Sequence, residues 1–263
     1  MRHGGQILAD QLKLHGVRRV FSVPGESFLA ALDGLYESGI ENIVCRHEGG
    51  AAMMAEAHGK MTGTPGIAFV TRGPGATNAS AGIHIARQDS TPMILFIGDV
   101  DRGMKDREGF QEVDFAAMFG PLCKWAARID EAARIPEYVA CAFNVAMSGR
   151  PGPVVLALPE DMLCELAEAL DRPRVDPVVQ AAHPDQMTDL ADRLAAAKAP
   201  VAIIGGAGWT PEAARNFQSF AESWGLPVAA GFRRQDAIAN DSPVWAGNLG
   251  YGPSPKLVAR IKA

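Results

Sequence analysis

Hydrophobic residues alternate between two patterns along the first 163 residues. Short apolar runs predict buried strands at 17–23, 43–45, 66–71, 93–97 and 153–158. Apolar positions spaced three or four residues apart predict helices at 6–15, 27–37, 49–60, 76–87 and 132–147. Strands that alternate with helices at short intervals indicate a parallel sheet. The pattern therefore predicts an α/β fold with a doubly wound parallel sheet and helices on both faces, interrupted by a long polar loop at 99–110.

A polar stretch with three prolines in 171–184 ends this first domain, which we assign to residues 1–170. Residues 171–183 are typical of a linker that runs over a surface. Beyond the linker, helical patterns at 184–198 and 211–224 alternate with apolar runs at 201–204 and 227–230, and a last helical pattern follows. Three α/β units at most are too few for a doubly wound domain. Residues 184–263 therefore predict a partial second α/β, Rossmann-like domain, and we expect the chain to be a piece of a longer protein.

Composition and charge exclude several classes of function. A net charge of -5 and a pI near 5.7 provide no broad basic surface for nucleic acid. No apolar run approaches the ~18 residues that span a membrane, and the opening residues lack an apolar signal core. The four cysteines form no Cys-x-x-Cys pair, which favours reduced core thiols in a cytoplasmic protein.

Histidines and acids show no spacing typical of metal ligands, so we expect no metal site in this chain. The four tryptophans are interpreted as packing residues.

Glu48 is the first candidate for chemistry, because it follows the strand at 43–45 and precedes a Gly/Ala-rich helix. Open α/β sheets bind ligands at the carboxyl ends of their strands. Two bends that contain glycine and proline, at 24–25 and 72–78, follow other strands at the same edge, where backbone can approach a flat ligand closely. Two alternatives stay open: Glu48 complements the positive N-terminus of its helix, and the bends are simple strand-to-helix turns.

A glycine-rich segment in the second domain looks like a dinucleotide-binding loop. It runs from Ile204 through Gly205, Gly206 and Gly208, but Pro211 stands where a third glycine would be. As a Rossmann fingerprint it is weak.

Six ordered motifs across residues 20–160 resemble the thiamine diphosphate-dependent, acetolactate synthase-like family. They are Val23-Pro-Gly25, Arg46-His-Glu48, Ala68-Phe-Val-Thr71 with Gly73-Pro-Gly-Ala-Thr-Asn78, Asp89-Ser90-x-Pro92, Phe110-Gln-Glu112 and Ser148-Gly-Arg-Pro-Gly-Pro-Val154. The resemblance implies a first domain that binds the aminopyrimidine ring of the cofactor and part of a middle domain, which holds FAD or another nucleotide in some members. The family's third domain binds the diphosphate and Mg²⁺. Its Gly-Asp-Gly signature is absent here, so the resemblance implies that Mg²⁺ binds through a missing C-terminal domain.

The resemblance also implies roles for individual residues. Glu48 would hydrogen-bond the pyrimidine N1′ and promote proton removal from the thiazolium C2, and Gln111 would reach the reacting centre. The implied cofactor contacts are Pro24, Gly25, Glu48, Gly73, Asn78, Ser90 and Gln111, with Arg150, Gly205 and Gly206 on the FAD or nucleotide side.

Two departures from the family pattern leave the substrate and FAD use open. Arg72 replaces the small residue usual before Gly-Pro-Gly, and Glu160 stands where acetolactate synthases commonly carry lysine.

Three functions remain. The first is thiamine diphosphate-dependent decarboxylation and carboligation of a 2-oxo acid. The second is decarboxylation of another substrate, as in an oxalyl-CoA-type enzyme. The third is a non-catalytic nucleotide-binding fragment.

The resemblance also bears on assembly. In the family the two halves of each site come from different subunits, which implies a homodimer or homotetramer. The partner would cover an exposed face of the Glu48 helix that includes Ala51, Ala52, Met53 and Met54, and the isolated chain would be inactive.

Overall fold

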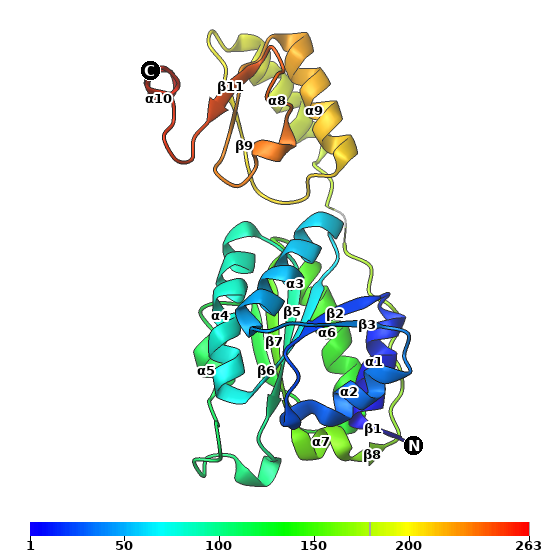
Figure 1. The fold of residues 1–263 in the computed structure, drawn as a ribbon. Helices are drawn as coiled ribbons and strands as arrows, with labels where there is room; N and C mark the ends of the chain where they lie inside the picture. The colour runs from blue at the N-terminus through cyan, green and yellow to red at the C-terminus, as the bar shows by residue number, and fades with distance from the viewer. Residues whose placement is uncertain (179, 263) are drawn as a thin grey trace. The chain divides into compact units, whose positions relative to one another are not determined.

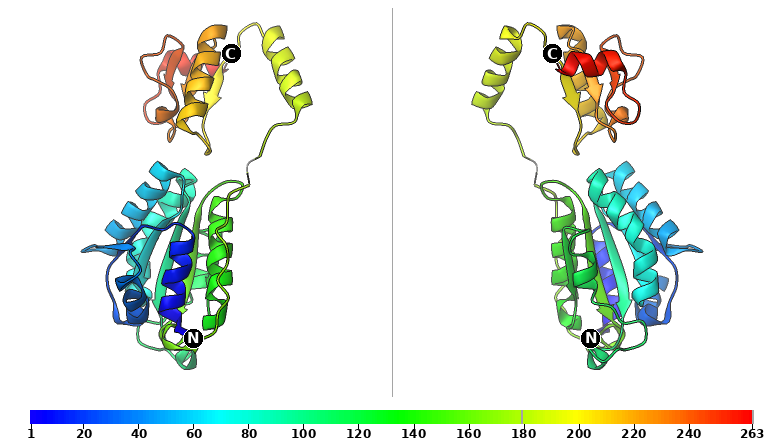
Figure 2. Two further views of the ribbon diagram at one scale, coloured as in Figure 1. Left: turned by 90° about the vertical axis from the view of Figure 1, so that its right-hand side faces the viewer. Right: turned by 90° about the vertical axis from the view of Figure 1, so that its left-hand side faces the viewer.

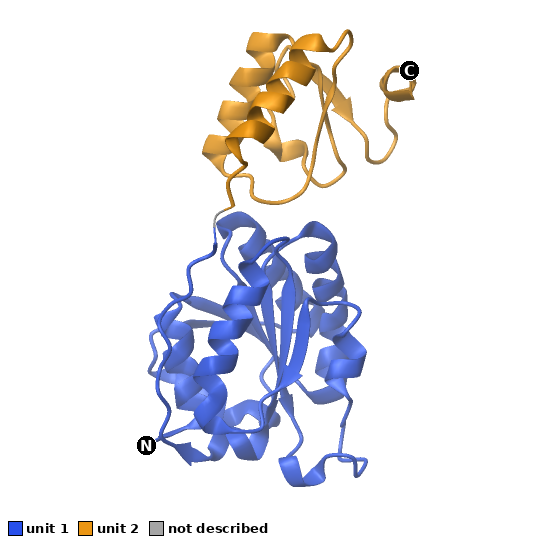
Figure 3. Cartoon of the chain, turned by 180° about the vertical axis from the view of Figure 1, so that it is seen from behind, with its two compact units in different colours: residues 1–178 blue, residues 179–263 orange. Residues whose placement is uncertain are grey.

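The computed structural model describes residues 1–178 and 180–262. The chain divides into a first unit, residues 1–178, and a second unit, residues 179–263 (Figure 3). Val179, inside the predicted linker, and Ala263, at the end of the predicted second domain, lie outside the described residues. No helix in the described part of the chain is both long and apolar enough to cross a membrane.

Six parallel strands form the central sheet of the first unit in the order β3-β2-β4-β5-β7-β6. They are β2 (Arg19–Ser22), β3 (Glu41–Val44), β4 (Gly66–Thr71), β5 (Met93–Asp99), β6 (Trp125–Arg128) and β7 (Pro153–Pro159). Helices lie on both faces of this sheet (Figures 1 and 2). The predicted doubly wound α/β fold is therefore confirmed.

Each face of the sheet has its own hydrophobic core. One face is covered by α1 (Gly4–Leu14), α2 (Leu29–Tyr36), α6 (Ile135–Met147) and α7 (Glu160–Cys164), and the other by α3 (Glu48–Thr62), α4 (Arg72–Asp89) and α5 (Phe115–Phe119). Strand β4 contributes Ile67 and Phe69 to the first core, and Ala68 and Val70 to the second. Successive strand residues point to opposite faces. An uninterrupted apolar run is therefore what a sheet covered on both sides requires.

Helices α3 and α4 pack closely because small residues face each other. A Cβ atom added to Gly82 would lie 2.5 Å from the Cβ of Ala52. Ala51 and Ala52 are fully buried, whereas Met53 and Met54 are 36% and 39% exposed. The expectation that all four residues lie on an open interface is therefore wrong for the two alanines, which α4 and the sheet already cover.

Several short elements differ from the prediction. Strand β6 was not expected, and α4 begins at Arg72 rather than at 76 because its Gly-Pro-Gly segment is helical. The long loop contains one 3-10 turn, η2 (Arg102–Met104), and further 3-10 turns are η1 (Glu26–Phe28) and η3 (Ala132–Arg134). The first unit also has a two-residue antiparallel pair, β1 (Arg2–His3) with β8 (Leu166–Ala167).

The cysteines and tryptophans follow their predictions only in part. Cys123 is buried and Cys45 is half-buried, but Cys141 and Cys164 are exposed, so the expectation of four core thiols is wrong. Trp224 is 49% exposed and is not a core residue. The other three tryptophans pack against a core, as expected.

The second unit contains a small parallel sheet in the order β11-β10-β9. Its elements are α8 (Pro184–Ala196), β9 (Ala202–Ile204), α9 (Pro211–Trp224), β10 (Val228–Ala230), the 3-10 turn η4 (Gln235–Ala237), β11 (Trp245–Asn248) and α10 (Pro255–Lys262). Its core includes Ile204, Leu226 and Val228. The α/β alternation agrees with the predicted second domain, although β11 was not predicted.

Candidate functional site

Most of the sequence-predicted site residues follow the carboxyl ends of neighbouring strands in the first unit. Gly25 follows β2, Glu48 follows β3, Gly73 follows β4 and Gln111 lies in the loop after β5. These strands are adjacent in the order β3-β2-β4-β5, so one edge of the sheet collects these segments. This is the edge where open α/β sheets bind ligands.

Glu48 is the first residue of α3 and lies beside the second turn of α4. The side-chain amide of Asn78 donates a hydrogen bond to Oε2 of Glu48 at 2.9 Å. The Nδ1 of His47 caps the helix by accepting the N–H of Gly49 at 3.0 Å. A Cβ atom added to Gly75 would lie 3.7 Å from the Cγ of Glu48. The carboxylate is therefore half-buried, oriented by Asn78, and bordered by bare glycine backbone.

The Pro24-Gly25 bend packs directly on the end of β4. A Cβ atom added to Gly25 would lie 2.4 Å from the Cβ of Thr71. Ser27 and Thr71 share a hydrogen bond of 2.7 Å between their hydroxyl groups. The close approach explains why glycine is needed at position 25, while Pro24 remains exposed at the surface.

Gln111 is held against α4 by backbone. The N–H of Gly73 donates to the carbonyl oxygen of Gln111 at 2.9 Å. Gln111 has a positive φ of 63°, as have Asp106 at 61° and Glu108 at 54°. Non-glycine residues rarely adopt this conformation, which costs about 1–3 kcal/mol and persists only where surrounding contacts fix it.

Glu112 makes the contacts that fix this loop, although the sequence analysis assigned it no role. Its carboxylate accepts the backbone N–H groups of Asp106 at 2.7 Å and Gly109 at 2.8 Å. These backbone hydrogen bonds lower the pKa of Glu112. Glu112 therefore closes the loop that presents Phe110 and Gln111. The Phe110-Gln-Glu motif contained the signal, because a carboxylate in a loop is well suited to accepting several N–H groups.

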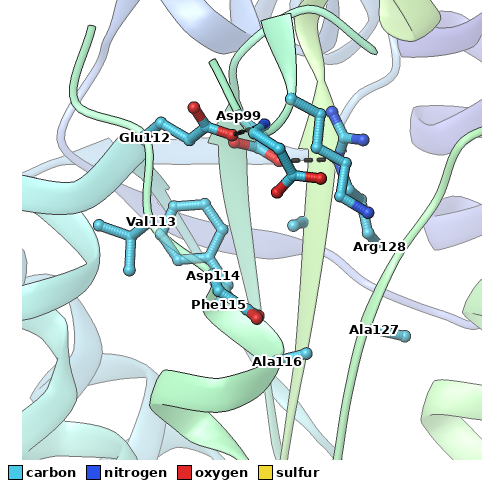
Figure 4. Close-up of a pocket in the computed structure, with 11 residues that line it drawn as sticks. Asp99, Glu112, Val113, Asp114, Phe115, Ala116, Ala127 and Arg128 are labelled. Carbon is cyan, nitrogen blue, oxygen red and sulfur yellow. Dashed lines mark hydrogen bonds and ion pairs between the residues drawn. The ribbon is translucent and has the colours of Figure 1, made fainter. Parts of the chain in front are cut away.

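A second charged group that sequence reasoning missed lies at the ends of β5 and β6. Asp99 is 4% exposed, and its Oδ2 accepts a hydrogen bond from Nε of Arg128 at 2.8 Å. Burial raises the pKa of Asp99. The pair borders a cavity of about 140 Å³, and Figure 4 shows the Glu112 side chain and the Phe115 ring facing the same space. The sequence offered no signal for this pair, because β6 was not predicted.

The structure does not bring Ser90 and Arg150 to the Glu48 edge. Ser90 is the C-cap of α4, at the end of the helix opposite to Arg72. The Nε of Arg150 donates to the Ser90 hydroxyl at 2.7 Å, and its Nη2 donates to the carbonyls of Arg87 and Gln88 at 3.1 Å. A helix of this length separates its ends by about 27 Å. Both residues therefore belong to a different part of the surface, where Arg150 satisfies the last carbonyls of α4.

Gly205 and Gly206 follow β9 in the second unit. Gly206 has a φ of 74°, and Cβ atoms added to either glycine would meet open space. The indole N–H of Trp209 donates to the carbonyl of Gly205 at 2.9 Å. The turn is therefore exposed backbone after a parallel strand, a position suited to a nucleotide. Within residues 1–178 and 180–262, no three acids, cysteines or histidines are grouped so that they could hold a metal ion.

Comparison with known proteins gives two family matches in chain order. Residues 2–118 match the thiamine pyrophosphate enzyme N-terminal TPP binding domain, and residues 187–263 match the thiamine pyrophosphate enzyme central domain. These two segments cover most of the chain and include the edge that carries Glu48, Asn78 and Gln111.

Several curated relatives are acetolactate synthases. The acetolactate synthase of Bacillus subtilis (strain 168) is 32% identical over 90% of this chain and 42% of its own length. The acetolactate synthase isozyme 2 large subunit of Escherichia coli (strain K12) is 33% identical over 94% of this chain and 45% of its own length. The large subunit of Lactococcus lactis subsp. lactis (strain IL1403) is 36% identical, over 86% and 40% respectively. The chain spans less than half the length of these relatives.

Proposed function

The chain belongs to the thiamine pyrophosphate enzyme family, and from this premise we propose that it supplies the aminopyrimidine side of an acetolactate synthase-like active site. The proposed reaction is decarboxylation of a 2-oxo acid followed by carboligation. The observation that carries the proposal is Glu48, whose half-buried carboxylate lies at a strand-end edge with one oxygen oriented by Asn78.

The residues at this edge fit thiamine diphosphate in two respects. Gly75 keeps the space beside Glu48 free of side chain, and Gly25 and Gly73 allow the bends to lie close to β4 and to the Gln111 loop. The hydrogen bonding of the two carboxylate oxygens of Glu48 also fits the cofactor. Asn78 binds only Oε2 of Glu48, and Oε1 has no hydrogen-bond partner among the described residues. That oxygen is available to a protonated ring nitrogen.

The chemistry follows from these positions. Bound thiamine diphosphate supplies the electron sink for loss of CO₂. Glu48 Oε1 would hold the proton at the pyrimidine N1′ of bound cofactor, while the Asn78 amide keeps Oε2 in place. Gln111 is held near the same edge by the N–H of Gly73, and Glu112 fixes the loop. In this scheme Asn78 and Gly73, both in α4, position Glu48 and Gln111, the two residues that we assign to catalysis.

Mg²⁺, FAD and assembly are further parts of the proposal. We assign Mg²⁺ and the diphosphate to a part of the enzyme outside this chain, because the described residues hold no cluster of metal ligands. The isolated chain would then be inactive. Gly205 and Gly206 of the second unit are assigned to FAD or another nucleotide, and Arg150 of the first unit is assigned separately as a nucleotide contact. We also propose a homodimer or homotetramer in which Met53 and Met54 are covered by a partner, since both lie exposed on α3.

The free thiols support a reducing compartment. None of the four cysteines forms a disulfide, and Cys141 and Cys164 are exposed, so we propose the cytoplasm as the location.

The substitution Glu48→Gln tests the central assignment in the protein as its gene encodes it. We expect pyruvate turnover and exchange of the thiazolium C2 proton, followed by NMR, to fall by about 10²-fold or more, the usual contribution of a positioned acid or base. Glu37→Gln is the matched control, because Glu37 is an exposed glutamate of the same unit outside this edge. Exchange at the wild-type rate in Glu48→Gln would refute the assignment.

A further inference from the structure

Arg72 is an unusual residue at the proposed active-site edge. It directly follows β4 and precedes Gly73, whose N–H binds Gln111. Its side chain is 8% exposed, and its φ of 40° lies in the region that favours glycine. A guanidinium is costly to bury and a strained backbone adds to that cost, so the surrounding structure must fix this residue for a reason.

Two glutamates that are distant from Arg72 in the sequence accept hydrogen bonds from its guanidinium group. Nη1 donates to Glu26 at 2.9 Å and Nη2 donates to Glu160 at 2.7 Å. Glu160 begins α7 after β7, and Glu26 lies in η1 after β2. The two departures from the family pattern, arginine at 72 and glutamate at 160, are therefore in direct contact.

The hydrogen-bonding capacity of Arg72 is not filled. Its Nε is buried and has no hydrogen-bond partner among the described residues. Leaving such a donor unpaired costs about 1–3 kcal/mol, and native structures seldom do so. Arginine presents its donors in a fixed planar fork that matches a carboxylate. The guanidinium group is therefore not fully satisfied by the acceptors that the described residues supply.

The space beside Arg72 is a hollow of about 180 Å³. It is lined by Arg72, Val100, Asp101, Met104, Gly109, Phe110 and Glu160. The Phe110 ring lies 6.0 Å from the guanidinium carbon and is 72% exposed, so it forms an open side of the hollow. Phe110 is also the neighbour of Gln111. The hollow therefore adjoins Gln111, one of the two residues to which catalysis is assigned.

Glu26 is the partner that a ligand can replace. Its side chain is 69% exposed, whereas that of Glu160 is 35% exposed. Glu26 itself loses little by turning into water, but the buried guanidinium then needs another carboxylate in its place. A ligand carboxylate that takes its place leaves the charge around Arg72 unchanged. Binding of a neutral group in the same place would leave Arg72 with only one counter-charge.

We propose that Arg72 is a specificity-determining residue that binds a second, distal carboxylate of the 2-oxo acid, with Glu26 as the group it displaces. The inference rests on the proposed function. It assigns a dicarboxylic 2-oxo acid as the preferred donor over a monocarboxylic acid of equal length. The reacting carboxylate is not the group bound, because a strong ion pair would oppose its loss as neutral CO₂.

A binding experiment tests the subsite without any turnover. Calorimetry on the protein as its gene encodes it compares glutarate, a non-reacting dicarboxylate, with pentanoate, which has the same length and one carboxylate. We expect glutarate to bind the wild type at least ten-fold more tightly than pentanoate, and Arg72→Gln to remove that difference. Equal affinities in the wild type, or an unchanged difference in Arg72→Gln, would overturn the inference whatever the enzyme catalyses.

A kinetic experiment measures the same preference during catalysis. The ratio of kcat/KM for 2-oxoglutarate to that for 2-oxopentanoate does not depend on the fraction of folded enzyme. Arg72→Gln should lower this ratio on the order of 10²-fold, as loss of a buried charge partner does. Glu26→Gln should raise it about two- to five-fold by removing the competing carboxylate.

The outcomes separate the two proposals. Turnover of 2-oxopentanoate in preference to 2-oxoglutarate would refute the inference and leave the proposed function intact. If pyruvate and both of these acids fail to react with thiamine diphosphate and Mg²⁺ present, the proposed function fails, while glutarate binding still decides the subsite. A purely structural Arg72 would lower stability in Arg72→Gln and leave the ratio unchanged, which would also overturn the inference.

Discussion

The contact between Gly73 and the Gln111 loop predicts that the substitution Gly73→Ala is damaging. An added Cβ atom would lie 2.9 Å from the carbonyl oxygen of Gln111 and 2.9 Å from Cγ2 of Val113. Both distances are shorter than the 3.4 Å at which ordinary van der Waals contact begins. Overpacking of this kind costs about 1–3 kcal/mol, and replacing a helical glycine by alanine returns about 0.5–1 kcal/mol. Taking values near the middle of both ranges, we expect a net loss of about 1–2 kcal/mol.

Thermal unfolding followed by circular dichroism measures this loss. A change of 1 kcal/mol shifts the Tm of a domain of this size by about 2–4 °C, so Gly73→Ala should melt about 2–8 °C below the wild type. Gly50→Ala is the control, because Gly50 is in α3 and an added Cβ atom there meets nothing within 4 Å. It should melt slightly above the wild type. If both variants melt alike, the close approach of the Gln111 loop to α4 does not exist.

Two further predictions concern Asp99 and Arg150. Burial raises the pKa of Asp99 above its ordinary value of 3.8. Between these two pKa values the folded state holds a proton that the unfolded state releases. The contribution of Asp99 to stability therefore falls as pH rises from 3.8 through the raised pKa. Chemical unfolding from pH 3 to 7 should therefore show Asp99→Asn gaining stability relative to the wild type with rising pH, and a constant difference would contradict the raised pKa. Arg150→Ala in the protein as its gene encodes it should weaken retention of FAD or an adenine nucleotide more than binding of thiamine diphosphate, with exposed Arg134→Ala as control. Calorimetry decides this, and equal weakening of both ligands would remove Arg150 from a nucleotide site.

The apolar pattern of the sequence predicted the central strands of the sheet correctly but missed the edge strand β6. Strands such as β5 are buried on every residue, so their apolar runs are unmistakable. Strand β6 pairs with β7 alone and its four residues are all half-buried, which leaves no periodic signal. The start of α4 was misplaced because Gly-Pro-Gly indicates a turn. Pro74 is nevertheless tolerated in the first helical turn, where its missing N–H would have had no partner.

The candidate site was predictable in position but not in its contacts. The strand-end rule was enough to select Glu48, and the family pattern was needed to select Asn78 and Gln111. Neither could show that Arg72 binds Glu160, since 88 residues separate them and only the order of β4 and β7 in the sheet brings them together. The burial of Ala51 was missed for a similar reason, because a helical pattern does not identify which neighbour covers each small residue.

The short β1–β8 pair has a consequence for how the first unit can be cut and rejoined. Arg2 pairs with Ala167 in backbone register and also donates to Asp171 at 2.7 Å, so residues 167–171 return to the start of the chain. Residues 1–171 therefore begin and end close together in the structure. A circular permutant that joins residue 171 to residue 1 through a short glycine-serine linker, with new ends at an exposed turn such as Gly63, would preserve every strand pairing of the large sheet. The β1–β8 pair joins residues near the two ends of the first unit, and closing so long a segment of chain costs conformational entropy. It would therefore form last when the natural chain folds, and first in the permutant, where the linker makes it local.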